Sequence, residues 1–486
     1  MSSRVVFAWV LWFGLLAMTA INALDPDLWW HLRTGQWIVQ NGRVPSTDPF
    51  SFTRPGAPWV SQEWLSELIF FELWKHGGPG TLIAFSSIIT TAGFLLLYFR
   101  CPGKPSWAAA ATALGALACA PSWGARPQMF TFTMASLLLW LVERAEHSAR
   151  LLFWVPPLFL LWLNLHAGFE LAPVLLMLYG AGLILEAAVG VAPWNQARPI
   201  ALRILVTILA CLALVPLNPN GARLYSYPLQ TLLSPGMRSF ILEWFSPDFH
   251  RAIYAPFLLV LLLLLLTLAG SHISVRGRIL LPLLFTTFAA LDAVRHIPIF
   301  ILLAIPVIMA AAPVSSASMA LTPPHPARAR FRLFFNALAI VLLAAFAFSR
   351  WATLARAQDA RESALFPQEA VSFLRNTPQP GRLFVYYDWG GYAIWKLYPQ
   401  YRVFADGRAD LYGDDLLKSI RTTVELGRGW HAVLDRWNVQ TILIPPGSAL
   451  AQALLIDPGW TAPHIDSHAA IFVRVSRPPE SQRGYP

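Results

Sequence analysis

Long stretches of apolar residues recur along the first 350 residues of the chain. About 20 such residues form a helix that can cross the roughly 30 Å of hydrocarbon in a bilayer. The stretches lie near residues 5–24, 81–99, 106–122, 128–143, 151–166, 170–190, 201–217, 254–271, 279–294, 297–312 and 333–350. This pattern predicts about eleven transmembrane helices, several of them short or interrupted by proline.

Beyond residue 350 the pattern changes to that of a water-soluble domain. Helical periodicity alternates there with β-rich runs, which predicts a small α/β domain. The helical runs are 367–377, 413–426, 429–437 and 449–457, and the β-rich runs are 382–387, 401–405, 439–445 and 469–475. We expect an α-helical polytopic membrane bundle over residues 1–350, with a first external loop over 25–80, followed by a soluble α/β domain over 351–486.

Composition and charge agree with a membrane protein. Hydrophobic residues make up 56% of the 486 residues and charged residues only 13%, whereas a soluble domain carries roughly 25% charged residues. The net charge of +10 does not indicate a nucleic-acid partner, because polytopic proteins gather Lys and Arg in their cytoplasmic loops. With a cytoplasmic N-terminus, the inner loops hold Arg100, Lys104, Arg144, Arg150, Arg198, Arg203, Arg276, Arg278, Arg328, Arg330 and Arg332.

The outer loops then hold most of the acidic and histidine side chains. An odd number of spans also places the C-terminal domain on this external face, whereas an even number would place it inside. The expected location is a bacterial inner membrane, with the N-terminus cytoplasmic and the C-terminal domain periplasmic.

Two carboxylates, Asp25 and Asp27, directly follow the first apolar stretch. Carboxylates two residues apart can share a divalent metal such as Mg or Mn, or one can act as a base while the other positions it. The alternative is a polar helix cap beside an aromatic belt formed by Trp29, Trp30 and Trp37. The location on the first external loop favours the chemical interpretation.

A D-x-D motif just outside the first span, a polytopic body and an external C-terminal domain together resemble the GT-C class of membrane glycosyltransferases. This class includes protein mannosyltransferases, aminoarabinose transferases and oligosaccharyltransferases. The resemblance implies a polyprenyl-phosphate sugar donor that is used on the external face. It also implies that Asp27 or Asp25 is the catalytic carboxylate, and Asp27 is favoured because Asp25 can also cap a helix end.

Transfer of a sugar from a lipid phosphate also requires positive charge to stabilise the departing phosphate. Arg126 and the neighbours Arg295 and His296 lie near external ends of predicted spans, where an Arg can bind two phosphate oxygens at once. The alternatives are snorkelling toward the interface or local ion pairing, for example between Asp292 and Arg295. His166 is interpreted as an interfacial histidine with satisfied hydrogen bonds rather than as a ligand.

Further acidic residues lie in the first external loop and in the C-terminal domain. Glu63 begins an amphipathic stretch that is predicted to lie along the membrane surface. With Glu67, one helical turn later, it is a candidate substrate-binding group, although a solvated polar face is the preferred interpretation of the pair. Asp48, in a Pro-rich turn, is explained by capping. The string FADGRADLYGDD at 404–415 forms a turn ion cluster or lines the same cleft.

The string VYYDWGGYAIW at 385–395 ends a predicted strand, and its glycines allow a tight turn. It resembles the WWDYG signature of oligosaccharyltransferases, which helps to hold the acceptor. Tyr386 and Tyr387 replace two tryptophans, and Trp389 replaces the tyrosine. The resemblance implies that Tyr387, Asp388 and Trp389 contact an acceptor, and the alternative is a turn packed on the domain core.

The predicted function is therefore transfer of a sugar from a polyprenyl-phosphate donor to a glycan, lipid or protein acceptor on the external face of the bilayer. One alternative is a ligase or polymerase of lipid-linked glycans that uses external Arg and His side chains. A secondary transporter would show inverted repeats and polar groups near the bilayer midplane, which the sequence does not suggest. A non-catalytic membrane protein with a glycan- or partner-binding external domain would tolerate loss of Asp25 and Asp27.

Overall fold

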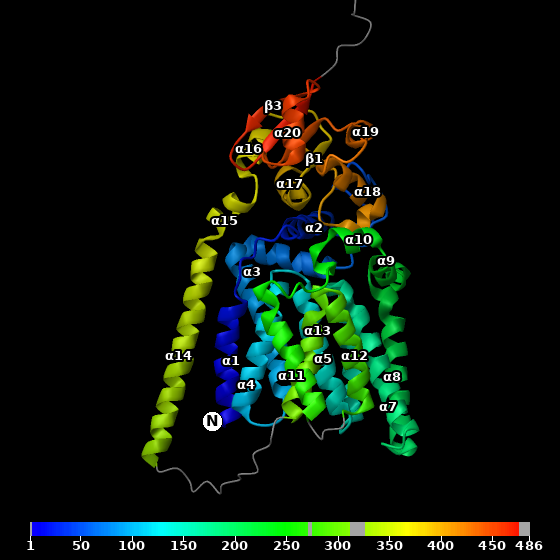
Figure 1. The fold of residues 1–486 in the computed structure, drawn as a ribbon, viewed down its shortest axis with the longest axis vertical. Helices are drawn as coiled ribbons and strands as arrows, with labels where there is room; N and C mark the ends of the chain where they lie inside the picture. Colours follow the sequence, from blue (N-terminus) through cyan, green and yellow to red (C-terminus); the bar gives the residue numbers. More distant parts are fainter. Residues whose placement is uncertain (1, 271–274, 312–325, 476–486) are drawn as a thin grey trace, which may run out of the picture.

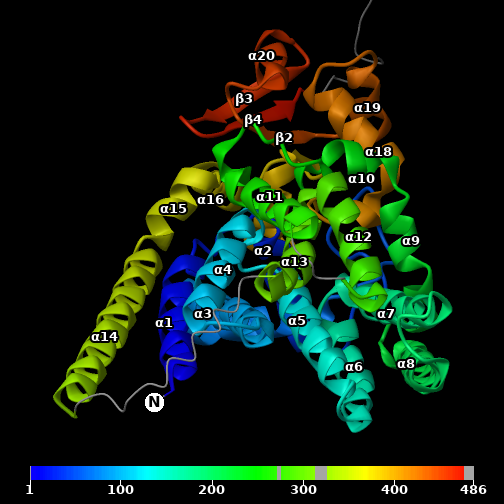
Figure 2. The same ribbon diagram turned by 60° about the horizontal axis from the view of Figure 1, so that its bottom comes forward.

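The computed structural model describes residues 2–270, 275–311 and 326–475, with the side chains of the last part described from residue 331. A bundle of long helices forms one end of the molecule, and a small domain with a β-sheet forms the other (Figure 1). The N-terminus lies at the end of the bundle that is far from the sheet. Figure 2 shows the same two parts with the bundle turned forward.

Each of the eleven predicted apolar stretches overlaps a helix of the bundle. These helices are α1 (Ser3–Thr19), α3 (Trp64–Arg100), α4 (Pro105–Ala118), α5 (Gln128–Ala145), α6 (Val155–Leu165), α7 (Leu171–Ala188), α8 (Trp194–Leu214), α11 (Ala255–Gly270), α12 (Gly277–Asp292), α13 (Ile297–Ala311) and α14 (Pro326–Arg356). Within the described ranges, six helical segments are long and apolar enough to cross a membrane. They are Trp64–Arg100, Ala167–Ala188, Trp194–Leu217, Ala252–Gly270, Val294–Ala311 and Phe331–Arg356. The chain is thus a multi-pass membrane protein, and the number eleven stays a prediction.

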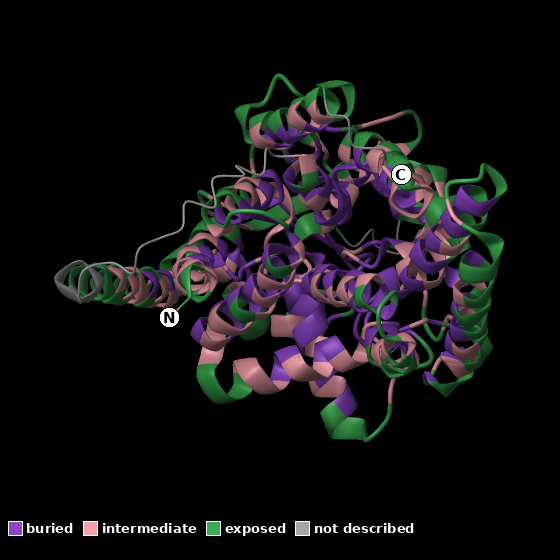
Figure 3. Cartoon of the chain, turned by 90° about the horizontal axis from the view of Figure 1, so that it is seen from below, coloured by how far each residue is buried: buried purple, intermediate pink, exposed green. Residues whose placement is uncertain are grey.

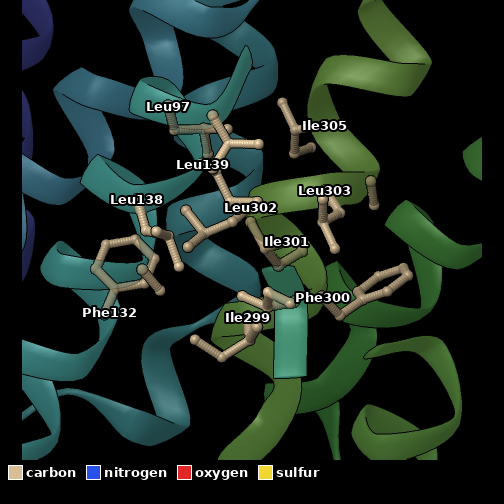
Figure 4. Close-up of a cluster of buried hydrophobic side chains, with 14 of the residues drawn as sticks. Leu97, Phe132, Leu138, Leu139, Ile299, Phe300, Ile301, Leu302, Leu303 and Ile305 are labelled. Atoms are coloured by element: carbon tan, nitrogen blue, oxygen red, sulfur yellow. The ribbon is translucent and has the colours of Figure 1, made fainter. Parts of the chain in front are cut away.

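The bundle is held together by close packing of apolar side chains around α13. Ile301 and Leu302 are fully buried there and meet Leu138 and Leu139 of α5 (Figure 4). A Cβ at Gly115 of α4 would lie 2.8 Å from Ile301, so this glycine allows α4 to approach α13 closely. Small residues at helix contacts are important in lipid, where dispersion contacts replace the hydrophobic effect. Seen along the bundle, buried residues line its inside and exposed residues its rim (Figure 3).

Two helices lie between the bundle and the sheet domain (Figure 1). One is α2 (Leu28–Asn41), and the other is the first part of α3, which is separated from the rest of α3 by a kink at Gly78. Gly78 has φ +62°, a backbone conformation that residues other than glycine rarely adopt. Pro79 follows it and cannot donate a helical hydrogen bond. The kink lets one long helix both cross the end of the bundle and continue down into it.

The C-terminal domain contains a four-stranded mixed sheet with the order β1-β2-β4-β3. Its strands are β1 (Leu383–Val385), β2 (Thr441–Ile444), β3 (Trp460–Ile465) and β4 (Ala470–Arg474), with β1 parallel to β2 and the other pairs antiparallel. Its helices are α15 (Gln358–Leu365), α16 (Gln368–Asn376), α17 (Gly390–Leu397), α18 (Ala409–Val424), α19 (Trp430–Arg436) and α20 (Ala449–Ile456). The four predicted helical runs and three of the four β-rich runs are confirmed.

The fourth β-rich run, 401–405, is not a strand of the sheet. Val403 makes single bridges to Ser51 of the first loop and to Leu383 of β1. The segment therefore lies between two parts of the chain that are distant in sequence. The local sequence does not reveal this position. The sequence also missed β3, because most of its side chains are exposed and Pro463 interrupts its pattern.

A buried charge cluster joins the first loop to the C-terminal domain. The Arg408 guanidinium donates to Asp406 at 2.8 and 2.7 Å, to Asp48 at 3.0 Å and to the Tyr412 hydroxyl at 3.2 Å. It also lies over the Trp59 ring, 4.6 Å from its centre. We call Arg408, Asp406, Asp48 and Tyr412 the Arg408 cluster. Asp48 also caps its own turn, as predicted, but the sequence did not suggest its ion pair.

Replacement of Arg408 by Ala should destabilise the protein strongly. Both Asp48 and Asp406 are almost fully buried, and removal of one partner from a buried ion pair costs about 3–5 kcal/mol. We expect the melting temperature of the variant in detergent to lie well below that of the wild type. Unfolding is monitored by tryptophan fluorescence. Arg421→Ala is the control, because Arg421 forms only an exposed pair with Glu425, which is worth about 0.3–0.5 kcal/mol. Equal melting temperatures for the two variants would contradict the structural role of the cluster.

Candidate functional site

The D-x-D motif lies at the start of α2, on the side of the bundle that carries the sheet domain. Asp27 is the residue that precedes α2, and its backbone N–H donates to Asp25 Oδ1 at 2.9 Å. Asp25 thus closes the turn that precedes α2, whereas no side chain caps the first turn of the helix itself, a role that the sequence suggested for Asp25. The Trp30 indole N–H donates to Asp27 Oδ1 at 3.1 Å, so the Asp27 carboxyl is held on one side of the helix start.

Asp27 lies in surroundings that favour its protonated form. Burial raises the pKa of Asp27 to about 7, and the nearby charge of Asp25 adds to this effect. The positive charge of Arg126 and the hydrogen bond from Trp30 act in the opposite direction but are smaller effects. A carboxyl with a pKa near 7 can both accept and release a proton near neutral pH.

Arg126 is fixed by two carboxylates. Its Nε and Nη2 donate to Asp25 Oδ2 at 2.7 and 2.5 Å, and its Nη1 forms an ion pair with Glu243. The sequence gave no sign of an acidic partner, because Asp25 and Glu243 are each more than 100 residues away. Arg126 is therefore a structural link between the D-x-D motif and the segment that follows α8, as well as a charge at the site.

A cavity of about 480 Å³ begins beside Arg126 and extends into the bundle. It lies between α3, α5, α7, α12 and α13, and its wall is mostly apolar. The ionisable side chains that line it gather toward the end of the bundle at which α5, α7 and α13 begin, and they are Arg126, His166, Glu170, Tyr227, Arg238, Glu243, Asp292, Arg295 and His296. Phe285 and Phe288 of α12 line the cavity and are also among the exposed apolar side chains of the bundle.

Arg295 lines this cavity and stacks on Trp244, with its guanidinium carbon 4.5 Å from the ring centre. The alternative pairing of Arg295 with Asp292 is wrong, because Asp292 accepts from Arg238 at 2.9 and 3.1 Å. Among the described residues no carboxylate lies within ion-pair distance of Arg295. His296 lies beside it, with Nδ1 3.2 Å from the Ala289 carbonyl oxygen. Arg295 thus offers unpaired positive charge to the cavity.

Glu63 and Glu67 do not form a solvated polar face, and this preferred interpretation is wrong. Their side chains are only 12% and 1% exposed, because the first part of α3 packs against α2 on this side. Glu63 lies between two imidazoles, 3.7 Å from His31 Nε2 and 3.4 Å from His166 Nε2. Burial, together with the charge of Glu67, raises the pKa of Glu63 well above its usual range.

His166 is held mainly by neutral hydrogen bonds, as the sequence suggested. The Gly168 N–H donates to His166 Nδ1 at 3.0 Å, and the Thr131 hydroxyl lies 2.6 Å from the same atom. Burial lowers the pKa of His166 to about 3, so the ring is neutral. Because Nδ1 accepts, Nε2 carries the proton and points to Glu63.

The three residues of the aromatic motif point in different directions. Tyr387 has a buried hydroxyl without a hydrogen-bond partner among the described residues, and its ring packs against Phe240. The pKa of Tyr387 is raised well above 10 by burial and by the facing charge of Asp27. Trp389 instead packs in the domain core, where its indole N–H donates to the Leu365 carbonyl at 3.2 Å. Asp388 is exposed.

Sequence reasoning undervalued several residues that surround Asp27. Asp410, in the 404–415 string, accepts from the Tyr227 hydroxyl at 3.1 Å, so this string does face the cavity-lining segment. Gly407 of the same string lies directly against the Asp27 carboxyl. The expected ion cluster is present, since Arg408 pairs with Asp406 and Asp48, whereas no residue of the string lines the cavity itself. The sequence signal was a dense acidic and basic string, but only the fold shows which residue faces the site.

The D-x-D motif does not fit a metal ion held by the protein alone. Both oxygens of Asp25 are already engaged, Oδ2 by the Arg126 guanidinium and Oδ1 by the backbone N–H of Asp27. Over the described part of the chain, His, Cys, Asp and Glu form no group of three or more that is able to hold a metal ion. We therefore assign no metal to Asp25 and Asp27.

The fold is similar to those of solved membrane glycosyltransferases. No protein-family model and no curated protein matches the sequence. The archaeal oligosaccharyltransferase AglB from Archaeoglobus fulgidus, in complex with an inhibitory peptide and a dolichol-phosphate, aligns over 90% of this chain and 69% of its own, with a TM-score of 0.55 and 12% identity. ArnT from Cupriavidus metallidurans, bound to undecaprenyl phosphate, aligns over 97% of each chain, with a TM-score of 0.49 and 13% identity. At such identities the likeness concerns the fold alone, and the chain has the GT-C fold that its sequence predicts.

Proposed function

We propose that the protein is a glycosyltransferase that moves a sugar from a polyprenyl-phosphate donor to an acceptor at the external surface of the membrane. The observation that carries the proposal is a carboxyl with a pKa near 7, Asp27, beside an apolar cavity that ends in Arg126 and Arg295. A lipid-linked sugar phosphate has the matching parts: an apolar chain, a negative phosphate and a sugar.

The cavity supports a lipid-linked donor. Its apolar wall suits a polyprenyl chain, and the proposed entry from the bilayer lies beside the exposed lining residues Phe285 and Phe288. Arg295, which has no carboxylate partner in the described part of the chain, suits the phosphate, with His296 beside it. Arg126 already binds Asp25 and Glu243, so its role is to add positive charge. The GT-C fold adds support, because the AglB structure carries a dolichol-phosphate.

In the proposed reaction, Asp27 accepts the proton of the acceptor nucleophile. The freed oxygen or nitrogen attacks the anomeric carbon of the sugar, and the bond between that carbon and the phosphate oxygen breaks. The electron pair of this bond leaves with the polyprenyl phosphate, whose new charge is stabilised by Arg295 and Arg126. Asp27 then releases its proton to water, and its pKa near 7 suits both steps.

Asp27 is a better base than Asp25. The lone pairs of Asp25 are engaged by Arg126 and by the backbone N–H of Asp27. These contacts occupy both carboxylate oxygens of Asp25, so these oxygens are less available to a proton of the substrate. We therefore assign the proton transfer to Asp27 and assign to Asp25 the placement of Arg126.

The acceptor is proposed to approach from the C-terminal domain. The buried, unpartnered hydroxyl of Tyr387 suits an acceptor contact, and Glu63 remains a candidate binding group on the opposite side. Asp388 is exposed and can act only at the rim, whereas the indole of Trp389 packs in the core and is better explained as a structural residue. The glycan, lipid or protein nature of the acceptor is not assigned.

The orientation in the membrane is also a proposal. The eleven expected spans, the cytoplasmic N-terminus and the periplasmic location of the C-terminal domain form one consistent arrangement, because the N-terminus and the sheet domain lie at opposite ends of the bundle. The same arrangement divides the chain near residue 350 and places the first loop, 25–80, on the bacterial periplasmic side.

Asp27→Asn should lower the rate of donor turnover in proteoliposomes at least 100-fold, because general-base catalysis typically contributes about 10²–10⁴-fold. Purified wild type and variant are compared with a panel of polyprenyl-phosphate sugars. In the wild type, kcat should fall as the pH decreases below about 7, because a protonated Asp27 accepts no proton. Asp415→Asn, at an exposed carboxylate, is the control. Full activity of Asp27→Asn would favour a ligase that depends on the external Arg and His side chains instead.

Arg295→Gln should raise the KM for the donor. A hydrogen bond to a charged group is worth about 1.5–3 kcal/mol, which corresponds to roughly 10- to 100-fold in KM. Arg421→Gln, at an exposed helical site far from the cavity, is the matched control. Unchanged donor kinetics in the Arg295 variant, measured in the same vesicles, would exclude Arg295 from the phosphate site.

A further inference from the structure

A loop of the C-terminal domain lies directly against the carboxyl of Asp27. The loop contains Gly407, and a Cβ added to this glycine would overlap Asp27 Oδ1 and lie 3.1 Å from the Trp30 indole nitrogen. The same indole N–H donates to the same Oδ1 at 3.1 Å. The glycine backbone, the indole and the carboxyl therefore form one packed contact that leaves no room for a side chain.

Two more glycines, at the start of α17, allow the surrounding backbone to approach as closely. A Cβ at Gly390 would lie 2.6 Å from the Asp406 Cα, and one at Gly391 would lie 2.8 Å from the Pro26 carbonyl oxygen. Gly390 has ordinary helical dihedral angles. Gly391 therefore serves close packing of α17 on the start of α2, and Gly390 serves close packing of α17 on the loop that carries Asp406, rather than the tight turn that the sequence suggested.

Contacts on both sides of Gly407 hold this loop in place. Before it, the Phe404 N–H donates to the Leu383 carbonyl at 2.8 Å, and the Phe404 carbonyl accepts from the Thr53 hydroxyl at 2.6 Å. After it, Arg408 is fixed by the Arg408 cluster. Because the residues on both sides of Gly407 are held by hydrogen bonds, its backbone has a fixed position in contact with Asp27.

We propose that Gly407 is a positioning residue, through which the C-terminal domain holds the Asp27 carboxyl against Trp30 in the orientation required for proton transfer. The inference rests on the proposed function and deepens it, because it makes the active site a joint product of the first loop and the C-terminal domain. A displacement of about 1 Å can cost roughly 100-fold in rate when a reacting group is misaligned.

The test is Gly407→Ala in the full-length protein, reconstituted in vesicles with a polyprenyl-phosphate sugar. We expect kcat to fall at least about 100-fold, with the donor KM within about twofold of the wild type, because the cavity does not include this loop. The matched controls are Gly381→Ala and Gly447→Ala, where a Cβ would meet open space. Both controls should retain wild-type kinetics.

The pH profile separates positioning from a merely structural role. A displaced Asp27 is more hydrated, so the acid limb of kcat should shift to lower pH in Gly407→Ala. The titratable groups that face Asp27 from other elements are unchanged in this variant and are Asp25, Glu63, Arg126, Tyr387 and Asp406. An unshifted profile with a uniformly lower rate would indicate fewer folded molecules and would overturn the proposal.

Each remaining outcome also decides the question. A Gly407→Ala variant that is as active as the wild type would overturn the positioning role and leave the proposed function intact. A wild type that turns over no donor would overturn both. If Gly407→Ala is not monodisperse in detergent, Gly391→Ala tests the placement of Asp27 from α17, through Pro26 and Trp30 on either side of it, with the same kinetics and pH profile. If both variants fail to fold, the contact serves folding and the proposal is wrong.

Discussion

The buried guanidinium of Arg408 is the interaction on which the arrangement of the site depends. It joins Asp406 of the C-terminal domain to Asp48 of the first loop, across 360 residues of sequence. A charge in such a place is stable only when it is fully paired and hydrogen-bonded, because its desolvation is costly. The pairing therefore fixes the distance between the first loop and the C-terminal domain, which are far apart along the chain.

The consequence is a candidate site to which two parts of the chain contribute. The membrane bundle supplies the apolar cavity with Arg126 and Arg295, and the first loop supplies Asp27. The C-terminal domain covers this carboxyl with backbone at Gly407 and directs Asp410 to Tyr227. The coverage removes water from Asp27, and this burial is the largest cause of its raised pKa. The packing of the C-terminal domain on the first loop thus influences the pKa of Asp27.

Within the described part of the chain, carboxylates near the cavity pair with Arg126 and Arg238 and leave Arg295 available. Arg126 is engaged by Asp25 and Glu243, and Arg238 is engaged by Asp292. Arg295 instead stacks on an aromatic ring, which keeps its side chain in place while its charge remains unpaired within the described ranges. A group that must bind a negative ligand benefits from such an arrangement, because no internal ion pair has to be broken first.

The sequence alone determined the membrane bundle, the C-terminal α/β domain and the motif that begins with Asp25 and Asp27. These follow from local patterns: runs of apolar residues, periods of 3.6 and 2, and spacing along one helix. The sequence could not determine that Glu63 is buried between His31 and His166, or that Arg126 pairs with Asp25. Such pairs join residues far apart in the chain, and only the packing of helices brings them together. Burial also decides protonation, so the acidity of Asp27 is a property of the tertiary structure.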